Sequence, residues 1–245
     1  MQADVLTIGS LGCHAATVVT AITTQDTSGV SAFTSIPPDD VRSQARAVLA
    51  DMPVAAFKVG MTGSAETVAV IAEIAAEFPN IPLILDPVLA SGRGDPLGNT
   101  GLRHALVERL LPRATIATPN SVEARALADA LGRSCRSLDT CAKRILDTGC
   151  SGVLITGTHE KTADVINTLY RRGEKPLIRS WPRLPGEYHG SGCTLAAAIA
   201  AMLAQGLDVI EACVEAQNYT VEALRHAFAA GRGQALPDRL FWARA

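Results

Sequence analysis

Residues 188–198, with the sequence YHGSGCTLAAA, lead from a glycine-rich turn directly into an alanine-rich helical run. Glycines allow unusual backbone angles, and because they lack side chains they let a ligand come close. The free N–H groups and the positive dipole end of the following helix would face that ligand, which suits a phosphate group. Cys193 would lie in the first helical turn, where the pKa of a thiol falls. A purely structural turn before a core helix with a buried cysteine is the alternative interpretation.

Outward from this turn, short aliphatic runs alternate with helical runs through the rest of the chain. Strands that are separated by helices and carry few charges predict a mostly parallel sheet, buried on both faces in a three-layer α-β-α sandwich. The chain shows no linker, low-complexity tract or repeat, so residues 1–245 are interpreted as one domain. Strands are expected at residues 16–22, 54–59, 82–86, 114–117 and 152–156, with a hairpin over 165–170 and 177–181. Helices are expected over residues 37–51, 64–78, 99–110, 138–148, 190–205 and 209–228, and another begins at Asn120.

The composition excludes some classes of protein. With 22 Lys and Arg against 24 Asp and Glu, the net charge of −2 argues against a nucleic-acid-binding protein that relies on bulk positive charge. The hydrophobic share of 48% is typical of a globular protein, and no apolar run has the roughly 18 residues of a membrane span. Residues 1–4 lack the basic head and apolar stretch of a secretion signal, so we expect a cytoplasmic protein. The 6 cysteines contain no CxxC pair, so we expect mostly small buried thiols rather than a zinc site.

Two further motifs place oxygen atoms at the ends of predicted strands. Asp86 ends the run 82–86, and in open α/β sheets ligands bind beyond the carboxyl ends of the strands. A carboxylate there can hold Mg2+ directly or through water. Asn120 and Glu123 follow the run 114–117 with the spacing of a capping box. A turn or a helix cap explains each motif by itself, but the same groups could also hold a hydrated Mg2+ at this sheet edge.

Taken together, these motifs resemble the ribokinase-like superfamily, and within it the hydroxymethylpyrimidine/phosphomethylpyrimidine kinases of thiamine biosynthesis. The resemblance runs in family order from Gln2 to about His226. The cysteine in the glycine-rich turn is especially specific, since most sugar kinases of the superfamily carry Asp there. The resemblance implies a ribokinase-like fold, ATP as the phosphate donor and Mg2+ as cofactor. The matching segments are residues 2–4 (QAD), 20–27 (TAITTQDT), 58–61 (KVGM), 85–88 (LDPV), 118–124 (TPNSVEA) and 189–194 (HGSGCT).

The resemblance also implies roles for individual residues. Cys193 matches the proposed base that takes the proton from the substrate hydroxymethyl group. The backbone N–H groups of Gly190, Ser191, Gly192 and Cys193 would hold the transferring phosphoryl group. Gln25 would hydrogen-bond the aminopyrimidine, because an amide both donates and accepts. The remaining expected residues are Asp4, Met61 and Val88 in the pyrimidine pocket, Asn120, Thr156 and His189 near the nucleotide, and Asp86, Asn120 and Glu123 around Mg2+, through water.

The partners implied by the resemblance are a small-molecule pyrimidine and a second copy of the chain in a homodimer, with no nucleic acid and no membrane. Family members usually begin with a strand and a Gly/Ser-rich loop ahead of the segment that matches residues 2–4. We therefore expect the first strand of the sheet to be missing and the domain to be truncated at its N-terminus relative to the family.

A second departure from the family pattern concerns the nucleotide. Many members carry Lys where Thr156 stands, so Arg93 or Lys161 would have to replace that positive charge. Two alternatives to the pyrimidine kinase therefore remain. One is a pyridoxal/pyridoxine-kinase-like enzyme, since both substrates are flat heteroaromatic rings with a hydroxymethyl group. The other is a non-catalytic pyrimidine-binding relic.

Overall fold

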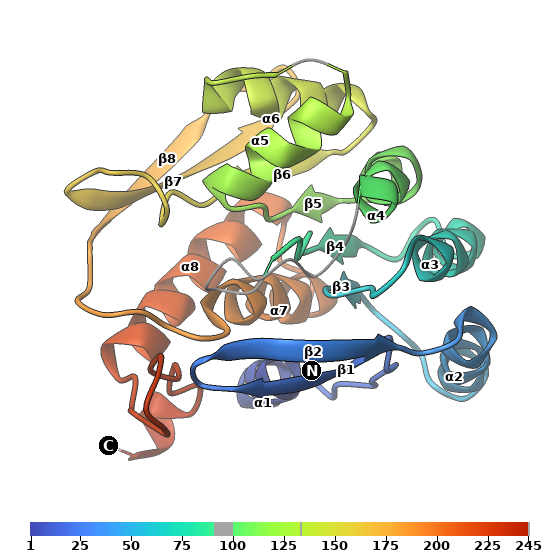
Figure 1. Ribbon diagram of the computed structural model, residues 1–245, viewed down its shortest axis with the longest axis horizontal. Coiled ribbons are helices and arrows are strands. Elements are labelled where there is room, and N and C mark those ends of the chain that lie inside the picture. Colours follow the sequence, from blue (N-terminus) through green and yellow to red (C-terminus); the bar gives the residue numbers. More distant parts are fainter. Residues whose placement is uncertain (91–99, 133, 245) are drawn as a thin grey trace.

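The computed structural model describes residues 1–90, 100–132 and 134–244, and a six-stranded sheet lies at its centre (Figure 1). The strand order is β3-β4-β5-β6-β7-β8; the strands from β3 to β6 pair in parallel, and β7 and β8 add as an antiparallel hairpin. The mostly parallel sheet predicted from the alternating pattern is therefore confirmed. The strands are β3 (Phe57–Val59), β4 (Leu83–Leu85), β5 (Ile116–Ala117), β6 (Gly152–Ile155), β7 (Asp164–Arg171) and β8 (Leu177–Pro182).

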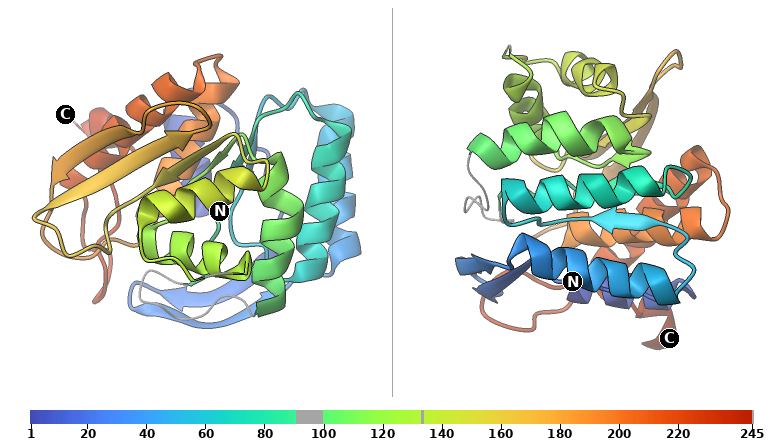
Figure 2. Two further views of the ribbon diagram at one scale, coloured as in Figure 1. Left: turned by 90° about the horizontal axis from the view of Figure 1, so that it is seen from above. Right: turned by 90° about the vertical axis from the view of Figure 1, so that its right-hand side faces the viewer.

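Two hydrophobic cores lie on opposite faces of the sheet and make the fold a three-layer sandwich. Leu83 and Leu85 of β4 pack into one core, whereas Ile84 between them packs into the other. This alternation is the period of two expected of strands buried on both faces. The first core is closed by α3 (Ala65–Glu77), α4 (Thr100–Ala105) with the turns 106–113, α5 (Ser121–Ala130) and α6 (Leu138–Asp147), and the second by α7 (Ser191–Ala204) and α8 (Val209–Arg225) (Figure 2). Outside these, α2 (Pro38–Asp51) packs on α3, and α1 (Gln2–Ser10) packs on α7.

The strand predicted over residues 16–22 is wrong for most of its length. Residues 13–20 form no regular element, and a separate hairpin of β1 (Ala21–Asp26) and β2 (Gly29–Ser35) follows. The backbone of Val19 is satisfied by a side chain instead of a neighbouring strand: its N–H donates to Gln44 Oε1 at 2.9 Å, and its carbonyl accepts from Gln44 Nε2 at 3.2 Å. A β-branched run forms a strand only where another strand is available to pair with it.

The cysteines depart in part from expectation. Cys150 and Cys213 are buried, as predicted for small apolar side chains. Cys135 and Cys141, however, form a disulfide between the segment after α5 and the first turn of α6. The prediction of mostly free thiols overlooked this pair, because the short irregular segment before α6 brings Cys135 next to Cys141, six positions further along the chain.

A cleft of about 2090 Å3 opens beside β3, between the β1–β2 hairpin and the N-terminus of α7. Phe57 N–H donates to the carbonyl of Pro82, and Val59 O accepts from Asp86 N–H, so these β3 residues direct their polar groups toward β4. The backbone groups of Lys58 face the opposite side, where no further strand pairs within the described residues. β3 is thus the edge of the sheet. No helix among the described residues has the length and apolarity needed to cross a membrane.

Candidate active site

The glycine-rich turn forms the N-terminus of α7, as predicted. Gly190 is the N-cap residue and has a φ of 81° and a ψ of 17°, a left-handed conformation that favours glycine. Thr194 N–H donates to the Gly190 carbonyl at 3.0 Å and closes the first helical turn. The N–H groups of residues 191–193 precede this bond and therefore have no partner within the helix. They give the end of α7 that lines the cleft the character of an anion-binding site.

A buried lysine lies among the acidic groups of the site. Lys58 Nζ is 2.9 Å from an oxygen of Asp4 and 3.7 Å from an oxygen of Asp86. Burial alone would lower the pKa of Lys58, but the negative charges of Asp86 and Asp4 help to raise it above its ordinary value. Lys58 is therefore charged at neutral pH. Gly60 makes room for it, because a Cβ at this position would lie only 2.7 Å from Lys58 Nζ.

Cys193 lies close enough to Asp86 for each side chain to shift the pKa of the other. Burial, reinforced by the carboxylates of Asp86 and Asp4 against the opposing charge of Lys58, raises the pKa of the Cys193 thiol to about 12. The pKa of Asp86 is raised as well, mainly by burial. The structure thus contains Cys193 as a neutral thiol beside a carboxylate, which corrects the expectation of a thiol pKa lowered by the helix N-terminus.

The predicted capping box at α5 is confirmed. Asn120 Oδ1 accepts from the N–H groups of Val122 and Glu123, both at 2.9 Å, and Glu123 Oε2 accepts from Asn120 N–H at 2.9 Å. The other oxygen of Glu123 accepts from Leu89 N–H at 3.4 Å. Burial, with the negative charge of Asp86, raises the pKa of Glu123 to about 8. The carboxyl groups of Asp86 and Glu123, which follow neighbouring strands, therefore interact electrostatically at the cleft.

The residues around Asp86 fit a hydrated magnesium ion. Within the described residues, no group of three or more His, Cys, Asp or Glu side chains is close enough together to ligate a metal ion directly. One oxygen of Asp86, however, is buried without a hydrogen-bond partner in the part of the chain that the structure describes. A second acidic group, Glu123, lies near enough to Asp86 for the charge of Asp86 to raise the pKa of Glu123. A Mg2+ ion that keeps several of its waters is held by one or two carboxyl groups, which Asp86 and Glu123 supply.

The other predicted residues line the same cleft. Gln25 is exposed on β1, and Met61 and Val88 follow β3 and β4 on the cleft wall. Thr156 forms a bridge with Asn120 at the start of α5, and its carbonyl accepts from Ser121 N–H at 3.0 Å. His189 N–H donates to the Ala235 carbonyl at 2.9 Å. The structure thus brings together every predicted site residue, listed by group as Asp4, Gln25, Met61, Val88; Asp86, Asn120, Glu123, Thr156; and His189, Gly190, Ser191, Gly192, Cys193.

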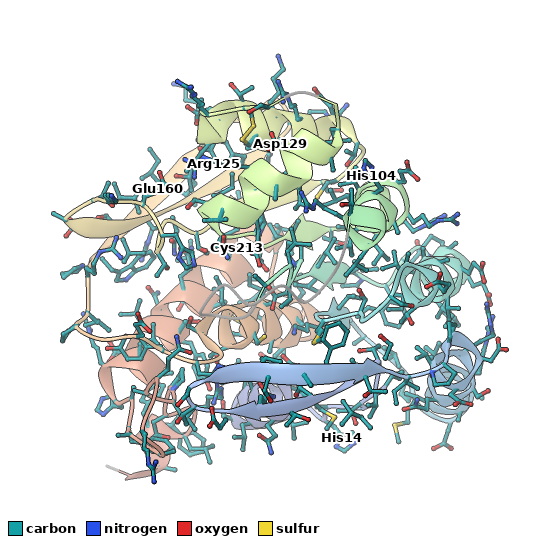
Figure 3. The ribbon with its side chains drawn as sticks, viewed as in Figure 1. His14, His104, Arg125, Asp129, Glu160 and Cys213 are labelled. Atoms are coloured by element: carbon teal, nitrogen blue, oxygen red, sulfur yellow. A yellow bond between two sulfur atoms is a disulfide. The ribbon has the colours of Figure 1, made fainter. Side chains whose placement is uncertain are left out.

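The loop after Thr156 is fixed to α5 by an ion pair. Figure 3 shows Arg125 of α5 and Glu160 of this loop as near neighbours, and two hydrogen bonds of 2.8 and 3.1 Å join them. Of the two residues expected to replace the missing lysine, Arg93 lies outside the described residues. Lys161 is exposed and does not line the cleft.

Two site residues escaped the sequence analysis. Lys58 is a charged residue in an otherwise apolar run, and this is a signal that could have marked it. Arg239 lies at the cleft in contact with Gly190 and Thr194, and nothing in its surrounding sequence indicates this position.

Comparison with known proteins now gives the family. The family model described as phosphomethylpyrimidine kinase matches residues 1–238. The chain belongs to the phosphomethylpyrimidine kinase family. Among its relatives, the hydroxymethylpyrimidine/phosphomethylpyrimidine kinase of Mycobacterium tuberculosis is 39% identical over 243 residues, which cover 98% of this chain and 88% of the relative. The predicted family and its class of enzyme, a phosphotransferase, are confirmed.

Two solved structures support the fold. The phosphomethylpyrimidine kinase of Clostridium difficile 630 has a TM-score of 0.77 and 30% identity, with 91% of this chain and 92% of that chain covered. The pyridoxal kinase of Staphylococcus aureus in complex with AMP-PCP and pyridoxal has a TM-score of 0.87 and 29% identity, with 100% of this chain and 89% of that chain covered. The ribokinase-like three-layer fold is thereby confirmed for this family member.

Proposed function

We propose that the protein transfers the terminal phosphoryl group of ATP to 4-amino-5-hydroxymethyl-2-methylpyrimidine and then to its monophosphate, as steps toward thiamine diphosphate. One observation carries the proposal: the anion-binding turn of α7, the Cys193 thiol and the Asp86 carboxylate line the same cleft as the amide of Gln25. An anion site next to a polar heterocycle pocket is what this reaction needs, because phosphoryl transfer depends mainly on positioning and on neutralising charge.

The turn of α7 binds the phosphoryl group in this proposal. The N–H groups of Ser191, Gly192 and Cys193 hold its equatorial oxygens, where charge accumulates during transfer. Asn120 and Thr156, at the start of α5, lie on the nucleotide side of the cleft. His189 orients the entry to the turn through its backbone bond to Ala235. Donors fixed in advance by a helix end do not have to reorganise during the reaction.

Asp86, Asn120 and Glu123 would hold Mg2+ through water. When bound there, the ion neutralises charge on the transferring phosphates. Asp86 contributes its buried, unpartnered oxygen, and Glu123 contributes a carboxyl group whose proton is easily displaced because its pKa is about 8. Lys58 supplies a permanent positive charge 3.7 Å from that same oxygen of Asp86.

Cys193 moves the proton of the substrate hydroxyl in this proposal. As the hydroxyl oxygen bonds to phosphorus, the bond from phosphorus to ADP breaks and its electron pair leaves with ADP. The hydroxyl proton passes to the Cys193 sulfur, and the thiol proton passes to Asp86. This relay suits a thiol with a pKa of about 12, which is a poor base unless it gives up its own proton at the same time.

The pyrimidine lies against Gln25, Met61 and Val88, with Asp4 below it. The side chain of Gln25 forms no hydrogen bond recorded among the described residues, so both its donor and its acceptor are available to a ring nitrogen and an adjacent amino group. Asp4 serves this pocket through Lys58, to which it is ion-paired. The proposal extends to a homodimer, in keeping with the resemblance, and to a location in the cytoplasm.

A side-by-side assay tests the substrate. The Staphylococcus aureus pyridoxal kinase, whose fold is similar, is described in complex with pyridoxal, which makes pyridoxal the competing substrate. ADP release is measured with the hydroxymethylpyrimidine, its monophosphate and pyridoxal at equal concentrations. We expect the highest kcat/KM with the two pyrimidines. A higher kcat/KM with pyridoxal contradicts the proposal, and tight pyrimidine binding without ADP release supports the non-catalytic relic.

A further inference from the structure

The last part of the chain folds back onto the phosphate-binding turn. Ala235 lies beside Tyr188 in a short parallel bridge, and its carbonyl accepts from His189 N–H at 2.9 Å. Ala235 N–H in turn donates to the Glu187 carbonyl at 3.0 Å. The segment that follows brings Arg239 behind the first turn of α7. The support of the turn thus comes from a segment that no sequence motif marks.

Arg239 closes a triangle of hydrogen bonds with Thr194 and Gly190. Its Nε donates to Thr194 Oγ1 at 2.9 Å, and its Nη2 donates to the Gly190 carbonyl at 3.4 Å. The Thr194 hydroxyl itself donates to the same carbonyl at 2.8 Å. Arg239 is only 8% exposed, and a Cβ on Gly190 would lie 2.9 Å from its Nη2. The guanidinium therefore packs directly against the residue that begins the helix.

The grip on the Gly190 carbonyl determines where the next N–H points. The peptide unit is planar and trans, so the carbonyl of Gly190 and the N–H of Ser191 point in opposite directions. Because the carbonyl is held toward Arg239 and Thr194, the Ser191 N–H is directed away from them, on the side where the turn lines the cleft. Thr194 N–H holds the same carbonyl at 3.0 Å, so loss of the side-chain bonds would leave the peptide on a single backbone bond. The peptide could then tilt and misalign one donor of the anion site.

Arg239 also adds charge to the site. Its three hydrogen bonds end on uncharged oxygens, those of Thr194, Gly190 and Pro237. No carboxylate lies within ion-pair distance of it in the residues that the structure describes. A buried cation without a contacting anion is costly, and an anion bound at the turn would repay part of that cost.

We propose that Arg239 is the positioning residue of the phosphate-binding turn: it fixes the Gly190 peptide so that the donors of α7 face the terminal phosphoryl group, and its charge favours that group. This inference rests on the proposed role of the turn. It assigns no contact between Arg239 and the pyrimidine, so its consequences concern the end of the nucleotide that carries the γ-phosphate.

The test compares two nucleotides by calorimetry, AMP-PCP, which has a γ-phosphate, and AMP, which lacks one. We expect Arg239→Met to weaken AMP-PCP binding by roughly 10- to 100-fold, the effect of losing hydrogen bonds made by a charged group, and to leave the Kd of AMP within about twofold. Arg239→Lys keeps the charge without the forked geometry and should fall between the two. Arg225→Met, which removes an exposed arginine paired with Glu222 on α8, is the matched control.

A second pair of variants covers the case in which Arg239→Met does not fold. Thr194→Val removes the bridging hydroxyl with little change of shape, and Thr194→Ser keeps it. We expect Thr194→Val to weaken AMP-PCP selectively, Thr194→Ser to bind like the wild type, and the Arg239→Lys/Thr194→Val double variant to lose less than the sum of the single losses. Unchanged AMP-PCP binding, or equal weakening of AMP and AMP-PCP, overturns the proposal. The binding assay contains no pyrimidine, so it tests the role of Arg239 alone. If the proposed substrate is wrong, the wild type shows no turnover with the pyrimidine in the separate ADP-release assay.

Discussion

The ammonium group of Lys58 lies 2.9 Å from a carboxylate oxygen of Asp4, which joins the edge strand β3 to helix α1. The side chains are 8% and 19% exposed, so solvent screens the pair only weakly. The same ammonium group is 3.7 Å from Asp86, which follows β4. One cation therefore holds together three elements at the floor of the cleft, and it limits the repulsion between two carboxylates that the proposed reaction needs.

Replacement of this cation should destabilise the fold. Lys58→Met leaves Asp4 and Asp86 without their positive partner, and breaking a buried pair on one side costs about 3–5 kcal/mol of unfolding free energy. Denaturation by urea, followed by circular dichroism, measures the loss. Lys175→Met, at an exposed position in the turn between β7 and β8, should change the stability by less than about 0.5 kcal/mol. Equal stability of both variants would show that the buried pair contributes nothing.

Two neighbouring glycines should respond differently to alanine. At Gly192 a Cβ meets nothing within 4 Å, so Gly192→Ala should fold normally but weaken AMP-PCP binding by about tenfold or more, because the methyl group stands where the phosphate approaches. At Gly190 the φ of +81° and the 2.9 Å approach to Arg239 make alanine destabilising. Gly9→Ala, where the space is also open, is the control for the substitution itself. Normal nucleotide binding by Gly192→Ala would place the phosphate elsewhere.

The stability should depend on pH through Glu123. Its pKa is raised from 4.5 to about 8 by burial and by Asp86, so the folded state holds a proton that the unfolded state has already lost. The contribution of Glu123 is complete below pH 4.5 and is lost as the pH rises through 8, with a slope of at most about 1.4 kcal/mol per pH unit. The difference between the wild type and Glu123→Gln isolates this slope. Added Mg2+ should reduce it, because a nearby cation favours the ionised form.

Removal of the sulfur should affect turnover more than binding. Cys193→Ala should lower kcat by roughly 10²- to 10⁴-fold, as is typical for the loss of a group that moves a proton in the transition state. The KM for the pyrimidine should change little. Cys213→Ala, at a buried thiol on α8 outside the cleft, is the control for a missing sulfur. A Cys193→Ala enzyme that turns over at the wild-type rate would exclude Cys193 from the proton path.

The pyrimidine end of the cleft has its own test. Gln25→Leu removes both the donor and the acceptor and leaves the ring nitrogen and amino group unpaired, so the KM for the pyrimidine should rise by roughly 10- to 100-fold. The KM for ATP should stay within about twofold. Thr24→Val, at the exposed neighbouring position, should change neither value. Equal changes in both KM values after Gln25→Leu would refute the pocket assignment.

The sequence predicts those helices whose caps and helix propensity favour the same structure as their packing in the fold. Ser64 caps α3 by accepting from Thr67 N–H, and Asn120 with Glu123 caps α5, so both helix starts could be predicted from residue type and spacing. The helix α1 shows the opposite case. It has no side-chain cap and contains Thr7 and Gly9, which are weak helix formers, and its packing on α7 stabilises it instead.

The site was predictable where a motif carries it and not where only folding brings charges together. The turn at Gly190 and the carboxylate Asp86 follow from glycine chemistry and from the position of strand ends. The role of Lys58 depends on Asp4, which comes from helix α1, far from Lys58 in the sequence. The thiol pKa was misjudged because the helix N-terminus is visible in the sequence, whereas the burial of Cys193 beside two carboxylates is not.

The contact between Arg239 and Gly190 also bears on how the enzyme is made. Residues 234–239 leave the ribosome after every other residue of the site, so the strands, the capped helices and α7 can all assemble before the segment that braces the turn exists. A nascent chain at that stage has the shape of the fold but an unsupported turn. If Arg239 positions the turn as proposed, competence to bind nucleotide therefore arises only after residues 234–239 have been synthesised.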